Sequence, residues 1–205
     1  MKSFLLMKIS NTYILIFSIC LAPFFSLLLI SLEFLEGRYF LFKENSIKFL
    51  IDQSYSIELN QDWVNLEELP QGAVQALVSV EDSRFYNHKG FSLFDIHSAM
   101  IQNLILGKKL RGASTITQQL ARTLFLNREK TIKRKLQEIR IAVALERSLT
   151  KKEILEYYLN TVYWGKGFNG IYFASRYHFR KPPNELTLDE FKELVQKLKR
   201  PDRNP

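Results

Sequence analysis

The sequence of 205 residues has one cysteine and three histidines, and this scarcity excludes several kinds of site. Cys20 cannot form an internal disulfide, and because it lies in an apolar run we expect no metal or redox role for it. His88 has no second histidine three or four residues away, which argues against a zinc site. Hydrophobic residues make up 46% of the chain, so the fold is expected to depend on an ordinary hydrophobic core.

Residues 9–32 contain no charged residue, which predicts a membrane span. As a helix this stretch is about 36 Å long, and a bilayer has about 30 Å of hydrocarbon. A cleaved signal peptide is the alternative, but the apolar stretch is longer than is usual and no small-residue cleavage site follows it. Lys2 and Lys8 favour residues 1–8 in the cytoplasm and the rest of the chain outside the cytoplasmic membrane.

Helical patterns dominate the chain after Pro70, so a mostly α domain is predicted over residues 70–205. Residues 33–69 show no long period and are interpreted as a linker or extended region, with short strands as an option. Capping boxes predict three helix starts, at Thr115, Thr150 and Thr187. Further helices are expected over 73–80, 93–105 and 131–148, and glycines at 165, 167 and 170 indicate a turn.

Two polar stretches are candidates for chemistry. EDSRFYNHKG, residues 81–90, offers a carboxylate that could accept a proton from a sugar hydroxyl, although Asp82 or Ser83 could equally cap a turn. RGASTITQQLAR, residues 111–122, joins a helix start to basic residues and could hold phosphate or sugar hydroxyls. A capped helix start, or the first helix of a DNA-binding helix-turn-helix, are the alternatives. The membrane span argues against nucleic acid as a partner.

Glu138 lies on a helix line that becomes apolar within one turn, because Ile141 and Leu145 follow it on the same face. A solvated ion pair with Arg134 is one interpretation. The other is a partly buried carboxylate beside cations, which is a common arrangement for functional groups.

These stretches, in this order, resemble the peptidoglycan glycosyltransferase domain of penicillin-binding proteins and monofunctional transglycosylases. The family motif E-D-x-x-F-x-x-H-x-G is present in residues 81–90, and G-x-S-T-I-T-Q-Q-x-x-K appears as GASTITQQLAR. The motifs R-K-x-x-E and K-x-E-I-L-x-x-Y-L-N appear as RKLQE, residues 134–138, and KKEILEYYLN, residues 151–160. The resemblance covers about residues 68–183, and the membrane span without a transpeptidase domain is similar to the monofunctional branch.

The resemblance implies a lysozyme-like, mostly α fold and lipid II as substrate, with release of undecaprenyl diphosphate and inversion at the anomeric carbon. Glu81 would be the general base, and Glu138 would organise the diphosphate site directly or through a divalent cation, Mg²⁺ or Mn²⁺, that is not tightly bound. No metal ligand is assigned. The implied substrate-binding residues are Asp82, Phe85, His88, Ser114, Thr115, Gln118, Gln119, Arg122, Lys130, Arg134 and Lys135.

The resemblance also implies the outer side of the bacterial inner membrane as the location. The implied partners are the growing glycan strand, the membrane and other cell-wall synthesis proteins. Three departures favour an alternative, a weakly active or inactive scaffold: Arg122 where the family has Lys, Lys130 where it has Arg, and a short, amphipathic C-terminal helix expected on the surface. A lysozyme-like hydrolase with Glu81 as general acid is a third hypothesis.

Overall fold

The structure is a computed structural model, and it describes residues 62–106, 114–127, 129 and 131–199. The expected membrane helix, the expected strands before residue 62, Lys130 and Pro201 lie outside these residues. Within the described part, no helix combines the length and the apolar character that crossing a bilayer requires.

Helices make up most of the described chain, which confirms the mostly α prediction, whereas the lysozyme-like arrangement stays a prediction. The elements in order are η1 (Leu66–Glu68), α4 (Ala73–Glu81), η2 (Phe85–Asn87), α5 (Leu93–Ile105), α6 (Ile116–Phe125), α7 (Ile132–Ser148), α8 (Lys151–Thr161), β1 (Tyr163–Gly165), β2 (Phe168–Asn169), α9 (Ile171–Phe179), η3 (Pro183–Glu185) and α10 (Leu188–Lys199). Helix α5 belongs to one compact unit, and the other elements of the described chain belong to a second unit.

The predicted capping boxes define the starts of three helices. Thr115 accepts from the backbone N–H of Gln118, whose side chain accepts in return from the backbone N–H of Thr115. Thr150 begins α8 with the same reciprocal bonds to Glu153. Thr187 and Glu190 repeat them at the start of α10. Each box satisfies N–H groups that a helix start leaves without partners, so these starts follow from local sequence.

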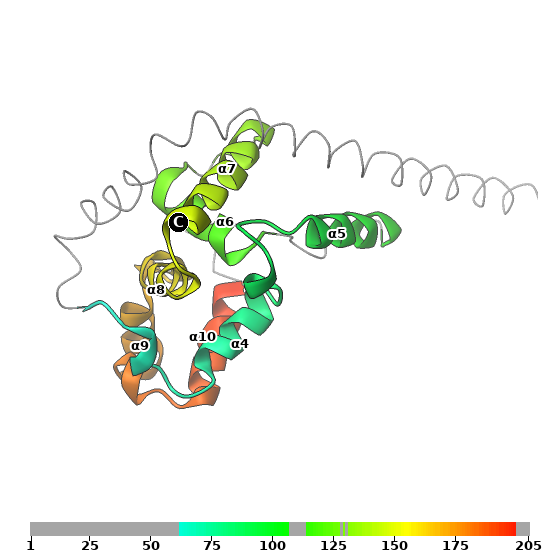
Figure 1. Ribbon diagram of the computed structural model, residues 1–205. Coiled ribbons are helices and arrows are strands. Elements are labelled where there is room, and N and C mark those ends of the chain that lie inside the picture. Colours follow the sequence, from blue (N-terminus) through cyan, green and yellow to red (C-terminus); the bar gives the residue numbers. More distant parts are fainter. Residues whose placement is uncertain (1–61, 107–113, 128, 130, 200–205) are drawn as a thin grey trace, which may run out of the picture. The chain divides into compact units, whose positions relative to one another are not determined.

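The core of the second unit forms where α6 packs against α7 and α8, and where α10 packs against α4 and β1 (Figure 1). The expectation that the last helix lies on the surface is wrong. Phe191, Leu194, Val195 and Leu198 are all buried, because they form one face of α10 that meets α4. The opposite face carries surface ion pairs, such as Lys192 with Asp189.

Three features were not expected from the sequence. The turn that the glycines indicated is present at residues 166–167, but it connects two short antiparallel strands, β1 and β2, which were not expected. Helix α9 follows the hairpin directly. Residues 63–69, expected to lie outside the domain, pack against α8: Trp63 meets the ring of Tyr157, and Val64 is buried and exchanges hydrogen bonds with Asn160.

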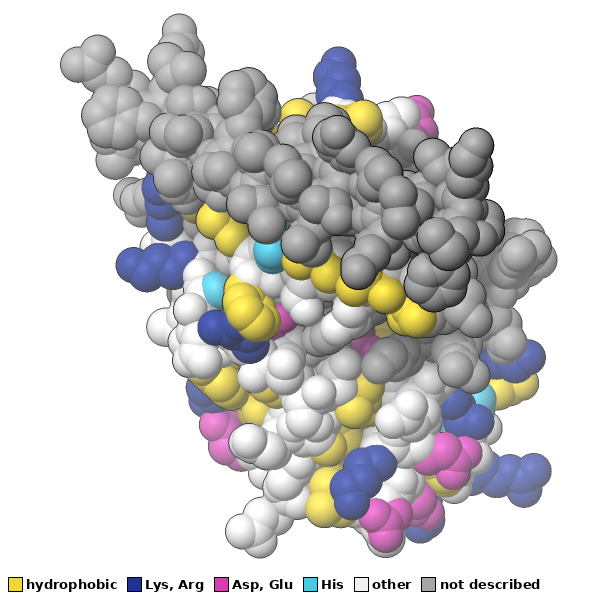
Figure 2. Space-filling view, turned by 90° about the vertical axis from the view of Figure 1, so that its right-hand side faces the viewer, with side chains coloured by type: hydrophobic (Ala, Val, Ile, Leu, Met, Phe, Trp, Pro, Cys, Tyr) yellow, Lys and Arg dark blue, Asp and Glu magenta, His cyan; other side chains and the backbone are white. Residues whose placement is uncertain are grey.

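The surface mixes charges of both signs. Figure 2 shows Lys and Arg side chains lying among Asp and Glu side chains in the lower part of the face that it draws. The net charge of +8 is therefore not spread evenly over that face, and local clusters matter more than the total.

Candidate active site

Glu81 is the last residue of α4, and Asp82 is the C-cap that follows it. The Asp82 carboxylate is almost fully buried, and it accepts from the Ile116 backbone N–H at 3.0 Å, at the start of α6. Both of its oxygens also lie within 3.1 Å of His88 Nε2. Because a carboxylate only accepts, Nε2 carries the proton and donates. Asp82 therefore joins the end of α4, the loop after it and the positive end of α6.

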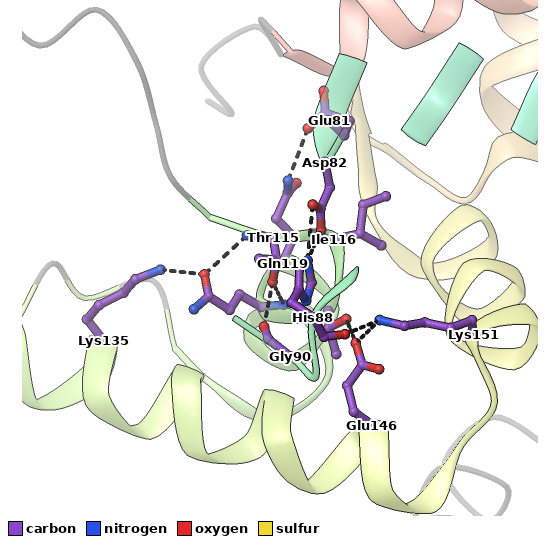
Figure 3. Close-up of polar contacts among 12 residues, drawn as sticks. Glu81, Asp82, His88, Gly90, Thr115, Ile116, Gln119, Lys135, Glu146 and Lys151 are labelled. Atoms are coloured by element: carbon purple, nitrogen blue, oxygen red, sulfur yellow. Dashed lines mark hydrogen bonds and ion pairs between the residues drawn. The ribbon is translucent and has the colours of Figure 1, made fainter. Parts of the chain in front are cut away.

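The loop returns to α6 through a close main-chain approach at Gly90. Its φ of +97° favours glycine, and a Cβ there would lie 2.8 Å from the backbone carbonyl carbon of Ala142 in α7. The Gly90 carbonyl accepts from Thr115 Oγ1 at 2.6 Å. The loop is thus held against both α6 and α7 by backbone atoms (Figure 3).

Glu81 is half-buried and is oriented by Gln119 of α6. Gln119 Nε2 donates to Glu81 Oε2 at 3.0 Å, and Gln119 Oε1 accepts from the hydroxyl of Tyr158 at 3.0 Å. The other carboxylate oxygen, Glu81 Oε1, is buried and has no protein partner among the described residues. One oxygen is therefore held, and the other has its lone pairs available for a proton.

A cluster of cations lies on the α7 side of the same helix start. Lys135 Nζ donates to Ser114 Oγ at 2.9 Å, to Gln118 Oε1 at 3.3 Å and to Glu138 Oε1. Arg134 Nη1 donates to the other oxygen of Glu138, which is fully buried. The surface ion pair considered for Glu138 is thus wrong, and the buried alternative is confirmed. Glu138 holds two cationic side chains at fixed positions.

The electrostatics connect this cluster with the surroundings of Glu81. Burial lowers the pKa of Lys135, Glu138 opposes this, and the charges of Arg122 and Arg134 lower the pKa further. Burial raises the pKa of Tyr158 well above its usual value, Glu81 adds to the rise, and Arg122 opposes it. Because its charge acts on both Lys135 and Tyr158, Arg122 lies near both groups. Gln118 and Gln119 are consecutive on α6. Gln118 accepts from Lys135, and Gln119 bonds to Glu81 and Tyr158.

A second cluster, which sequence reasoning missed, supports the loop where the end of α7 meets the start of α8 (Figure 3). Lys151 Nζ donates to the His88 carbonyl at 2.8 Å and to Glu146 Oε1 at 2.7 Å, and Thr117 Oγ1 donates to the same Glu146 oxygen at 2.6 Å. Lys151 Nζ also lies 4.1 Å from the centre of the Phe85 ring.

Phe85 does not occupy the position expected of a substrate-binding residue. Its ring is fully buried and packs edge-on against Tyr86 and His88, beneath Lys151. A side chain with no accessible surface cannot contact a ligand, so Phe85 supports the loop from inside.

The structure brings most of the predicted residues together around the start of α6. Among the described residues, Lys135, Arg134 and Ser114 gather on the α7 side, and Glu81, Asp82, His88 and Gln119 on the α4 side, with Thr115 and Gln118 buried between them. The charge of Arg122 acts on groups of both sides. The motif KKEILEYYLN already contained Lys151 and Tyr158, but it does not show that they reach His88 and Gln119. No local pattern marks Glu146.

The described side chains do not fit a divalent cation held directly by Glu138, because both carboxylate oxygens already bond to Arg134 or Lys135. Within the described part of the chain, no group of three or more His, Cys, Asp or Glu side chains could hold a metal ion. Other buried polar atoms remain without a protein partner there, namely His88 Nδ1, Gln118 Nε2 and Arg134 Nε. Buried polar atoms are normally hydrogen-bonded, so a water molecule or a ligand is needed to complete these three.

The arrangement can do two things chemically. It holds a carboxylate with one free oxygen, which can accept a proton. It also holds a guanidinium and an ammonium group near hydroxyl and amide groups at a helix N-terminus, which can stabilise an anion such as a phosphate.

Comparison with known proteins agrees with this chemistry. The family described as Transglycosylase matches residues 50–205. The chain is 38% identical over 160 residues to a biosynthetic peptidoglycan transglycosylase of Nitrosomonas eutropha, covering 78% of this chain and 66% of that protein. It is 43% identical over 131 residues to penicillin-binding protein 1F of Bacillus subtilis, covering 64% and 18%. It is 45% identical over 127 residues to penicillin-binding protein 1A of Escherichia coli, covering 62% and 15%.

The chain thus spans less than two thirds of the length of each of these relatives. The family match, however, covers most of the chain and includes every residue of both clusters around α6. The chain belongs to the transglycosylase family.

Proposed function

We propose that this chain is a peptidoglycan glycosyltransferase that polymerises lipid II into glycan strands. The family match and the relative named biosynthetic peptidoglycan transglycosylase support this proposal. The observation that carries it is the free oxygen of Glu81 on one side of α6, with a fixed group of cations on the other.

In the proposed reaction, the 4-hydroxyl oxygen of the acceptor N-acetylglucosamine attacks C1 of the lipid-linked N-acetylmuramic acid. Glu81 Oε1 takes the hydroxyl proton as the new C–O bond forms. The bond from C1 to the diphosphate oxygen breaks, undecaprenyl diphosphate leaves with the electron pair, and the anomeric configuration inverts. A sugar hydroxyl is a weak nucleophile, so a positioned base contributes typically about 10²–10⁴ in rate.

The leaving diphosphate needs positive charge as the bond breaks. Arg134, Lys135 and Arg122 supply it in this proposal, and Ser114 adds a hydrogen bond. Glu138 contacts none of the reacting atoms: it holds the two α7 cations in place. A divalent cation, if the reaction uses one, would find no free oxygen on Glu138, because Arg134 and Lys135 bond to both.

The proposed location is the outer side of the bacterial cytoplasmic membrane, with residues 9–32 as the anchor. A lipid-borne substrate explains an anchor, because the site then stays at the membrane surface where the substrate lies. The growing glycan strand is the second proposed partner.

The test is polymerisation of lipid II by the purified full-length chain with Mg²⁺ or Mn²⁺. We expect Glu81→Gln to lower the rate at least about 10²-fold, because an amide cannot accept the proton at this step. Glu193→Gln on the exposed face of α10 is the matched control, and we expect it to keep the wild-type rate and melting temperature.

Three other outcomes would contradict the proposed function or the proposed role of Glu81. A well-folded wild-type chain that makes no polymer would support the scaffold hypothesis. Cleavage of preformed glycan would support a hydrolase. Near-normal polymerisation by Glu81→Gln would reject Glu81 as the base.

A further inference from the structure

The side chain of Tyr158 reaches the end of α4 through one intermediate residue. Its hydroxyl lies 3.0 Å from Gln119 Oε1, and Gln119 Nε2 lies 3.0 Å from Glu81 Oε2. Tyr158 and Gln119 come from α8 and α6, so three helices meet in this short chain of hydrogen bonds. The Tyr158 ring is fully buried, which leaves its hydroxyl little freedom.

The direction of these hydrogen bonds follows from the chemistry of the groups. An ionised carboxylate only accepts, so Gln119 must present its NH₂ group to Glu81. Its carbonyl oxygen then faces Tyr158, which must donate. If the amide were reversed, its oxygen would face the carboxylate and repel it. Burial and the nearby charge of Glu81 raise the pKa of Tyr158, so the phenol keeps its proton and stays a donor.

We propose that Tyr158 is a positioning residue: through Gln119 it fixes the Glu81 carboxylate so that Oε1, and not Oε2, accepts the proton. Oε2 already accepts from Gln119, whereas Oε1 is buried without a protein partner among the described residues. This inference rests on the proposed function, in which Glu81 is the base.

Loss of the Tyr158 hydroxyl has a predictable consequence for Glu81. Without this donor, the carbonyl of the half-buried Gln119 side chain loses its protein partner, so the amide loses its fixed orientation. The hydrogen bond to Glu81 then weakens, and this bond favours the ionised carboxylate. The charged groups that face Tyr158 are Glu81 and Asp82 at the end of α4 and Arg122 on α6, and none of them changes in this substitution.

The first experiment measures lipid II polymerisation against pH for Tyr158→Phe, which keeps the buried ring. We expect the acid limb of kcat/KM to move up by about half to one pH unit, and kcat at neutral pH to fall about tenfold with KM nearly unchanged. Tyr157→Phe is the matched control, because this neighbouring buried tyrosine packs its ring on Trp63 instead of on Gln119. An unmoved acid limb in Tyr158→Phe would overturn the proposal.

A double-mutant cycle separates positioning from a general loss of stability. Gln119→Met removes the amide and should move the acid limb at least as far as Tyr158→Phe does. Adding Tyr158→Phe to Gln119→Met should then move it no further, because the connecting residue is gone. Additive shifts would show that Tyr158 acts by another route.

A second readout does not depend on activity. In protein with ¹³C-labelled glutamate, the carboxyl signal that disappears in Glu81→Gln should titrate at a higher pH in Tyr158→Phe than in the wild type. If the wild type makes no polymer but this signal shifts, the proposed function fails and the contact between Tyr158 and Glu81 stands. An unshifted signal in an active enzyme would refute the positioning role alone.

Discussion

Lys135 is the residue whose charge depends most on its neighbours. Its ammonium group bonds to Ser114, Gln118 and Glu138, and burial lowers its pKa more than Glu138 raises it. As pH rises, Lys135 therefore loses its proton before an ordinary lysine does, whose pKa is about 10.4. In the proposed reaction this loss removes a cation from the diphosphate.

We expect Lys135→Arg to move the alkaline limb of kcat/KM to higher pH, because a guanidinium stays protonated throughout the measurable range. The rate at neutral pH should fall several-fold, roughly the effect of one altered charge-assisted hydrogen bond, since the larger group cannot repeat all three contacts. The measurement is the pH–rate profile with lipid II. Lys133→Arg, an exposed substitution on the same helix, should leave the limb in place. A limb that does not move in Lys135→Arg would mean that another group sets it.

At the scale of elements, the segment that follows α4, residues 82–92, depends on main-chain contacts with neighbouring helices. Gly90 is the tightest of these, because its left-handed φ and its approach to Ala142 both exclude a side chain. Gly167, in the turn between β1 and β2, has a similar φ of +87° but nothing within 4 Å of its Cβ position. Alanine substitutions at the two glycines therefore separate the cost of backbone strain, which both positions share, from the cost of steric overlap, which arises only at Gly90.

We predict that Gly90→Ala lowers the free energy of unfolding by about 2–5 kcal/mol, from conformational strain together with overpacking against α7. Gly167→Ala should cost only the strain, about 1–2 kcal/mol. Urea denaturation followed by circular dichroism measures both. Equal losses at the two positions would show that the contact with Ala142 is relaxed at little cost.

At the scale of the whole second unit, α4, which carries Glu81, packs against α10, the last helix of the described chain. Phe191 is fully buried where α10 packs against α4. Phe191→Ala should therefore destabilise the fold by about 3–5 kcal/mol. Lys192→Ala, the next residue, is exposed and should change stability by less than about 0.5 kcal/mol. Thermal unfolding compares the two, and a small effect of Phe191→Ala would mean that α10 is not part of the core.

The sequence predicted what local chemistry controls. The starts of α6, α8 and α10 follow from capping boxes that span four residues, and they were placed correctly. The hairpin was missed because β1 and β2 hold three and two residues, too few for an alternating pattern. The surface position expected for α10 was wrong because an amphipathic pattern does not show what the apolar face packs against, and here that face is buried where α10 meets α4.

For the candidate site, too, the sequence predicted what local motifs mark and missed what distant contacts determine. The motifs named Glu81, Gln119 and Lys135, but not their connections. Tyr158 lies 39 residues from Gln119, and Lys151 lies 63 residues from His88. No local periodicity reports contacts of that range, so the supporting residues became visible only once the helices were placed.

The bond from Lys151 to the His88 carbonyl has a consequence for mutagenesis. The acceptor belongs to the main chain, so every amino acid at position 88 offers the same oxygen. An alanine scan of the whole loop would therefore not detect this hydrogen bond. Only a change at Lys151 itself would expose how far the loop relies on it.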